Sequence, residues 1–343
     1  MDELAKTEAR NYLCAAGFFM IAAFFISQIF SEVGTAAFVE PNDNIHIALG
    51  LGLLIVATLL IVLHKRDLIA ILFFMTGFWQ LFAAFTPSEL WGIILMGFLV
   101  LVALVTLTGQ DKKKWLLFLI PLLCFIPGLI GELIGFNPYV GMVFIIILAV
   151  ICLYYAFCCA CERISLPGSK ILTADEATDF KASGSVLGYM LFAVLTGGYA
   201  LHYILGEAVL PLDSFVTMEL LAGSLMIFVA ILLFAVGKMR FTPIMFMLVG
   251  LIGILSMYSS GAMFIGLGIL MIVLGLFAML RKESRILPGI MLIVYGCTWF
   301  FSAYVAGTSI SMPVVSALLN GIPALIAIYL SFVVYSQRKL PKF

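Results

Sequence analysis

HKRDLIAILFFMTGFWQLFAA, residues 64–84, begins with a short basic cluster and continues as an uninterrupted apolar run. Lys65 and Arg66 stand at its start, and no further Lys or Arg occurs before Lys112. GKMRFTPIMFMLVGLIGILSM, residues 237–257, repeats this order of charge and hydropathy in the second half of the chain. An apolar run of this length behind basic residues is typical of a helix that spans a membrane and begins on its cytoplasmic side.

The composition excludes an ordinary soluble domain. Apolar residues make up 64% of the 343 residues and charged residues only 10%, whereas soluble domains hold about 45–50% and about 25%. A soluble core of this size has no room for so many apolar side chains, so we predict an integral membrane protein with the lipid bilayer as its main partner. The formal net charge is zero, which argues against nucleic acid as a partner.

Twelve apolar segments follow one another, and each is long enough for a hydrocarbon core of about 30 Å at 1.5 Å of helix rise per residue. Helices are expected because a helix satisfies its own backbone polar groups inside a bilayer. The predicted fold is therefore all-α and polytopic. The predicted spans are 12–31, 45–63, 68–86, 91–108, 115–134, 139–161, 184–205, 215–236, 242–258, 262–280, 286–306 and 312–336.

The eighteen Lys and Arg residues all fall in every second loop or at the chain ends. Cytoplasmic loops carry the Lys/Arg excess in membrane proteins, so both termini are predicted to be cytoplasmic. The predicted location is the cytoplasmic (cell) membrane, as a multi-pass protein. The loops between them hold acids and no base, which gives the outer face a negative potential.

One long polar stretch, residues 163–183, divides the chain nearly in half. We predict that it is a cytoplasmic linker between two six-helix units, 1–162 and 184–343. The two halves resemble each other at an offset of about 170–174 residues, and their basic loops fall at matching places. Because six is an even number, both halves would cross the membrane in the same direction, as parallel repeats about an axis along the membrane normal.

The last helix of each half resembles that of the SatP/YaaH family of acetate and succinate uptake proteins. In the first half, LYYAFCCACERISLPGSKIL from Leu153 has the tyrosines and small residues, the acid and the Gly-Lys tail of that family. The matching residues are Tyr154, Tyr155, Glu162, Gly168, Lys170 and Leu172. The second half has AIYLSFVVYSQRKLP from Ala327, and GKMRFTPIMFMLVG from Gly237 is similar to a segment of the related AmiS/UreI group of urea and amide channels.

This resemblance implies six helices around a narrow pore for small monocarboxylates or neutral polar molecules. It also implies a homo-oligomer, a trimer of tandem chains, where single-unit relatives form hexamers. The chain departs from the family at the first helix, where the Asn-Pro-Ala-Pro-Leu-Gly-Leu signature is absent. A second resemblance, of GLGILMIVLGLFAMLRKES from Gly266 and GIMLIVYG from Gly289, is to the glycine-spaced helical hairpins of HdeD-like membrane proteins.

Polar side chains inside a span are candidates for function because they are costly in a bilayer. Two spans place aromatic rings beside polar groups, where the rings would narrow a solute path and Gln80 and Thr298 would offer hydrogen bonds. Plain packing is the alternative role. The candidates for this path are Trp79, Gln80, Tyr258, Thr298, Trp299, Phe300 and Tyr304.

Four residues near the outer helix ends are candidates for a polar or proton-binding mouth: Gln28, Glu32, Glu132 and Glu219. Glu219 is the most informative, because residues 219–236 are already about long enough to span a membrane. The alternative is that all four reach the headgroup region and are solvated.

No sequence motif indicates catalysis, a cofactor or a metal. The phosphate-loop, HExxH and GxSxG motifs are absent, and the three His residues fall on different loops. We therefore predict no enzyme, no cofactor and no metal site. Cys158, Cys159 and Cys161 cluster at the cytoplasmic end of a span, where palmitoylation and simple packing are the two interpretations.

Three functions remain open on the sequence. The leading hypothesis is a permease or channel for small monocarboxylates such as acetate, with or without a coupled proton. The second is a channel for urea or short amides. The third is an accessory or structural membrane protein, HdeD-like, that moves no solute.

Overall fold

A computed structural model describes residues 3–32, 43–64, 68–85, 138–160, 180–206, 213–237, 239, 241–256, 262–280, 286–308 and 312–337, with 117, 119–120 and 122–123 between them. All of the longer elements in these ranges are α-helices, and the described residues include no strand. The all-α prediction is confirmed for this part of the chain.

The chain divides into two compact units, residues 1–179 and 180–343. The boundary lies inside the stretch 163–183 that was predicted to be a linker. In the first unit, four helices coincide with predicted spans: α1 (Glu3–Glu32), α2 (Asp43–His64), α3 (Leu68–Phe85) and α6 (Pro138–Ala160). The first turns of α1, which precede its apolar run, are rich in Glu, Ala and Lys, and these residues favour helix.

In the second unit, helices occupy all six predicted spans. They are α8 (Phe180–Leu205), α9 (Asp213–Ala235), α10 (Phe241–Ser256), α11 (Ala262–Leu280), α12 (Ile286–Thr308) and α13 (Pro313–Gln337). Helix α8 begins earlier than residue 184, within the predicted linker. Gly206 follows its last residue and has a positive φ of 86°, which glycine adopts readily after a helix. The Gly206 N–H donates to His202 O at 2.8 Å.

Eight of the described helices are long and apolar enough to cross a membrane: α1, α2, α6, α8, α9, α11, α12 and α13. Helices α3 and α10 are apolar but shorter, and the 16 residues of α10 reach about 24 Å. These lengths and compositions indicate a multi-pass membrane protein. The predicted span 91–108 lies outside the described residues, as does 115–134 apart from 117, 119–120 and 122–123.

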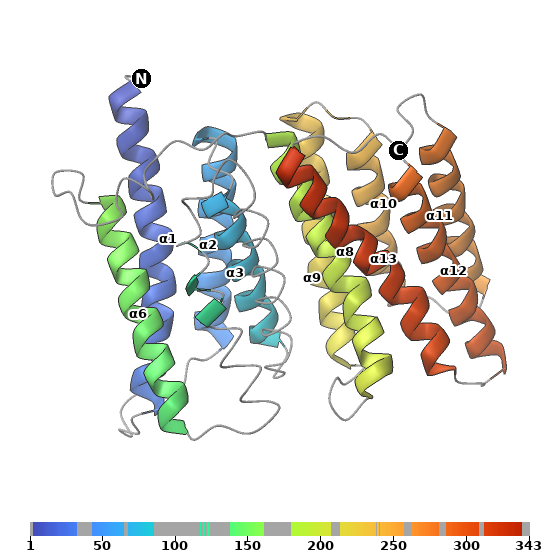
Figure 1. Ribbon diagram of the computed structural model, residues 1–343, viewed down its shortest axis with the longest axis horizontal. Coiled ribbons are helices and arrows are strands. Elements are labelled where there is room, and N and C mark those ends of the chain that lie inside the picture. The colour runs from blue at the N-terminus through green and yellow to red at the C-terminus, as the bar shows by residue number, and fades with distance from the viewer. Residues whose placement is uncertain are drawn as a thin grey trace. The chain divides into compact units, whose positions relative to one another are not determined.

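The helices of each unit pack in corresponding pairs (Figure 1). In the first unit α1 packs against both α6 and α2, and α2 packs against α3. In the second unit α8 packs against α13 and α9, and α9 packs against α10. Helix α12 joins the second bundle between α11 and α13. Three helix pairs among the described residues therefore correspond in the two units: first with last, first with second, and second with third.

Two glycine crossings make this correspondence exact to the residue. In the first unit, a Cβ on Gly77 of α3 would lie 2.9 Å from Gly50 O of α2. In the second unit, a Cβ on Gly250 of α10 would lie 2.5 Å from Gly223 O of α9. Gly50 and Gly223 differ by 173 in residue number, and so do Gly77 and Gly250. The same close backbone approach thus occurs at the same place in each unit, which small residues permit.

A phenylalanine fills the space above a first-helix glycine in each unit. A Cβ on Gly17 would lie 2.2 Å from the Phe73 ring, and a Cβ on Gly188 would lie 2.2 Å from the Phe246 ring. The residue after each glycine is aromatic and meets that ring edge-on, with centroids 4.9 Å apart for Phe18 and Phe73. In the second unit, the ring centroids of Tyr189 and Phe246 lie 5.1 Å apart.

The contact between Gly188 and Phe246 gives a first prediction. We expect Gly188→Ala to destabilise the second unit by about 1–3 kcal/mol, because the new methyl group needs the space of a buried ring. Phe246→Leu on the Gly188→Ala background should recover much of the loss, since Leu leaves that space free. Thermal unfolding in detergent, followed by size-exclusion chromatography, measures the loss of stability in Gly188→Ala and its recovery in the double variant. Equal stability of wild type and Gly188→Ala would contradict the contact.

Candidate functional site

A buried amide and an imidazole pair across the first unit. His46 lies in the first turn of α2 and Gln80 in α3, and Nδ1 of His46 lies 2.7 Å from Oε1 of Gln80. Gln80 is only 2% exposed. The Phe24 ring of α1 meets the His46 ring edge-on at 5.3 Å and the Trp79 ring at 5.9 Å. Three helices therefore hold this polar pair among aromatic rings.

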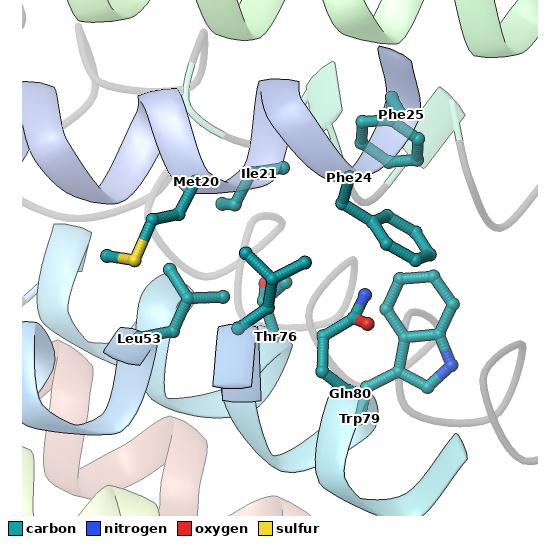
Figure 2. Close-up of a pocket in the computed structure, with 9 residues that line it drawn as sticks. Met20, Ile21, Phe24, Phe25, Leu53, Thr76, Trp79 and Gln80 are labelled. Atoms are coloured by element: carbon teal, nitrogen blue, oxygen red, sulfur yellow. The ribbon is translucent and has the colours of Figure 1, made fainter. Parts of the chain in front are cut away.

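A small pocket lies beside the pair. It is partly open and has room for about one water molecule in this conformation. Figure 2 shows Met20, Ile21 and Phe24 of α1 on one side and Thr76 and Gln80 of α3 on the other. The residues that line it are Met20, Ile21, Phe24, Phe25, Leu49, Leu53, Thr76, Trp79 and Gln80.

The pocket wall contains polar groups with spare hydrogen-bonding capacity. The His46 ring uses one end of the Gln80 amide, and the other end makes no hydrogen bond within the described part of the chain. The Thr76 hydroxyl donates to Leu72 O at 2.8 Å, which leaves its lone pairs free to accept. These groups could hydrogen-bond a water molecule or another small neutral molecule that has both a donor and an acceptor.

The second unit holds a buried carboxyl group. Glu219 of α9 is 5% exposed, and the Tyr199 hydroxyl of α8 donates a short hydrogen bond to its Oε1. The Tyr199 ring stacks on Phe215 at 4.4 Å. The Ser256 hydroxyl of α10 lies within hydrogen-bonding reach of the same carboxyl group. Glu219 is therefore inside the bundle and bonded there, which differs from the solvated alternative.

Glu219 and His46 stand at equivalent places. Each lies four residues before the glycine of its helix crossing, Gly223 in α9 and Gly50 in α2. Each side chain bonds to a neighbouring helix of its own unit. The two bundles thus place a polar, ionisable group at one matched position near the start of the second helix.

A second group of polar side chains joins α12 to α13. The Thr298 hydroxyl lies 3.1 Å from Leu319 O of α13, and Asn320 Nδ2 donates to Ser316 O at 2.9 Å. Tyr203 of α8 reaches the Ser316 hydroxyl. The predicted Trp299 is buried, stacks on Phe264 at 5.6 Å, and its indole nitrogen makes no hydrogen bond of good geometry to a described residue. Thr298 and Trp299 lie together in the interior of the second bundle.

Of the remaining candidates from the sequence, the structure places the side chains of Phe300 and Tyr304, and both lie away from the groups described above. Phe300 packs against Gly268 of α11, 3.0 Å from where a Cβ would stand, and Tyr304 is 47% exposed. Tyr258 and Glu132 lie outside the described residues. Gln28 and Glu32 belong to α1, but their side chains are outside the described part. Trp79 and Gln80 are the predicted pair that the structure places beside a pocket.

His46 and Tyr199, the partners of Gln80 and Glu219, were not predicted from the sequence. A histidine close to a helix end looks like a headgroup residue, and a lone tyrosine looks like part of an interfacial belt. One signal for His46 was present: the offset of 173 that aligns residues 64–84 with 237–257 also aligns His46 with Glu219. The alignment contains no such signal for Tyr199.

No group of three or more His, Cys, Asp or Glu side chains among the described residues could hold a metal ion. Cys158 and Cys159 are buried thiols at the end of α6, while Cys161 lies outside the described residues. No family model, curated protein or solved structure matches the chain.

Proposed function

We propose that the chain is a membrane transporter or channel for small monocarboxylates such as acetate, coupled to a proton. The observation that carries the proposal is the buried polar group at one matched position of each bundle, His46 with Gln80 and Glu219 with Tyr199. Polar groups inside a bilayer are costly and mark solute or proton pathways. The resemblance of the helix ends to the SatP/YaaH family points to the same substrate class.

The proposed architecture has twelve spans in two parallel six-helix repeats. The protein lies in the cytoplasmic membrane, and both of its termini are in the cytoplasm. The matched glycine crossings and the matched helix neighbours support the repeat. The alternating basic loops support the orientation. A trimer of tandem chains is the proposed assembly, on the family resemblance alone.

The electrostatics favour passage of the carboxylate together with a proton. Arg10 and Lys181, the Lys and Arg residues inside candidate spans, stand at the cytoplasmic ends of those spans in the proposed orientation. A carboxylate would therefore meet mainly amides, hydroxyls and aromatic rings on its way, which do not repay the loss of its hydration. A proton that crosses with the carboxylate lowers that cost, because the two together carry no net charge.

Uptake of labelled acetate into vesicles that contain the purified protein tests this function. We expect uptake faster than in protein-free vesicles and faster at acid than at neutral external pH, because more protons are then available to cross with the substrate. Background permeation of acetic acid is subtracted with protein-free vesicles at each pH. Equal rates in both kinds of vesicle at both pH values would rule the proposal out.

A urea or short-amide channel is the second candidate. It is favoured by the uncharged pocket wall and by the spare hydrogen-bonding groups of Gln80 and Thr76. This candidate predicts that the same vesicles swell in urea or acetamide, as measured by stopped flow, at a rate that does not depend on a proton gradient. The acetate proposal does not predict this swelling.

An accessory membrane protein is the third candidate. It is favoured by the pairing of α11 with α12, where a Cβ on Gly275 would lie 2.7 Å from Gly289 O and a Cβ on Gly268 would lie 2.9 Å from Gly296 O. This is the hairpin packing that the HdeD-like resemblance implies. Copurification with a partner protein, together with no solute flux, would favour this candidate.

A further inference from the structure

Hydroxyl groups of α8 and α10 lie around the Glu219 carboxyl group, and no Lys or Arg of the described residues forms an ion pair with it. Helix α8 offers the Tyr199 hydroxyl, and α10 offers the Ser256 hydroxyl. Tyr295 of α12 is a further neighbour of the carboxyl group. The nearest basic side chain along α8, His202, packs its ring against Phe215. Among the described residues, none provides Glu219 with an ion pair, so its negative charge has no counter-charge there.

The position of Glu219 makes that charge costly. Glu219 lies four residues inside the candidate span Phe215–Ala235, about 6 Å along the helix. It is 5% exposed and lies one helical turn before Gly223, where a Cβ would stand 2.6 Å from Gly250 O of α10. A buried carboxylate without a cation is therefore unstable relative to the neutral acid, unless hydrogen bonds replace water.

The hydrogen bonds around Glu219 can serve both forms. The Tyr199 hydroxyl donates to one carboxyl oxygen whether the group is charged or neutral. The Ser256 hydroxyl donates to Gly253 O, and its lone pairs are then free to accept the proton of a neutral acid. Rotation of the Ser256 hydroxyl toward Glu219 would supply a second donor to the carboxylate. The site therefore suits a group that gains and loses a proton in place.

The first unit has no carboxyl group at the equivalent position. His46 stands there, with its Nδ1 beside Gln80 Oε1 and its ring edge against Phe24. The small pocket with spare hydrogen-bonding groups lies in this unit, beside the same pair. The same place in the repeat thus carries a histidine beside a small pocket in one half and a hydrogen-bonded acid in the other.

We infer that the two halves have divided the work: Glu219 in the second half is the proton-binding group that couples transport, and the His46–Gln80 pocket in the first half binds the solute. This inference rests on the proposed transport function. It predicts that the chain has one coupling carboxyl group rather than one in each half, so loss of Glu219 alone abolishes coupling.

The transport test compares two measurements on reconstituted Glu219→Gln. Accumulation of labelled acetate against its gradient, driven by an acid exterior, should fall to the level of protein-free vesicles. Exchange of labelled for unlabelled acetate at equal pH should remain, since exchange needs no net proton movement. Glu8→Gln, which removes an exposed carboxyl group at the start of α1, is the matched control and should leave both unchanged. Unimpaired accumulation by Glu219→Gln would overturn the inference while leaving transport itself established.

A chemical test is independent of transport. Dicyclohexylcarbodiimide is apolar and adds to a protonated carboxylic acid, so the adduct has the summed mass of the two. We expect mass spectrometry to find the adduct on the peptide that contains Glu219, more at acid than at neutral pH, and absent from Glu219→Gln. Labelling of Glu8 but not of Glu219 at every pH would overturn the proton site even if acetate uptake is observed. Labelling of Glu219 in a protein without uptake would retain the site and reject the transport function.

Discussion

Gly250→Leu is expected to prevent the second unit from folding to its native packing. A Cβ at this position would lie 2.5 Å from Gly223 O, 3.1 Å from Ile227 Cγ1 and 3.2 Å from Met226 Cβ. The nearest atom belongs to the backbone of α9, so it cannot turn away as a side chain can. Helices α9 and α10 would have to separate, and the buried residues around them would lose their contacts.

The expected cost is about 3 kcal/mol or more, at the upper end for overpacking, which corresponds to a fall in Tm of about 6–12 °C for a unit of this size. Thermal unfolding of the detergent-purified protein measures the shift, and the yield of monodisperse protein reports failure to fold. Gly77→Leu should act in the same way on the first unit, since its Cβ would meet Gly50 O at 2.9 Å.

Gly266→Leu is the matched control. Gly266 is an exposed glycine inside α11, and a Cβ there would meet nothing within 4 Å. The same substitution should leave Tm unchanged or raise it slightly, because Leu favours helix more than Gly does. Equal effects of Gly250→Leu and Gly266→Leu would show that helix propensity, and not the close crossing, sets the stability.

Most of the fold could be predicted from the positions of basic clusters and apolar runs. The second half illustrates this: Lys238 and Arg240 precede α10, and each of the six predicted spans is a helix. Helix ends were less predictable, because α1 and α8 extend past the apolar run into polar sequence that still favours helix. The partner of each helix was not predictable, since it depends on which glycines meet.

Of the polar pairs at the candidate site, one residue of each pair could be predicted from the sequence and its partner could not. Gln80 and Glu219 stand out in the sequence because each is polar within or beside a long apolar run. Their partners His46 and Tyr199 do not stand out, because a helix-end histidine and a single tyrosine are ordinary in membrane proteins. The pairing of His46 with Gln80 follows from the Gly50–Gly77 crossing, which fixes how α2 and α3 face each other. The pairing of Glu219 with Tyr199 follows from the packing of α9 against α8.

Gln80→Leu is expected to slow solute uptake strongly. The substitution keeps the approximate volume of the side chain but removes both ends of the amide, so the pocket loses its buried hydrogen-bonding group and His46 Nδ1 loses its acceptor. Loss of a hydrogen bond that leaves a buried polar group unpaired costs about 1–3 kcal/mol, and each 1.4 kcal/mol is tenfold, so uptake should fall by about fivefold to 150-fold. Initial rates of acetate and acetamide uptake in vesicles measure the loss.

Two further variants separate solute binding from stability in this prediction. Thr58→Val removes a hydroxyl of α2 that bonds to Leu54 O in its own helix and does not line the pocket, so uptake should be unchanged. The double variant His46→Phe with Gln80→Leu removes both partners, so no buried polar group is left unpaired and Tm should rise above that of Gln80→Leu. Uptake by the double variant should stay as low as that of Gln80→Leu, because the amide is still missing. Recovery of uptake together with Tm would instead mean that Gln80 serves packing and that the solute passes elsewhere.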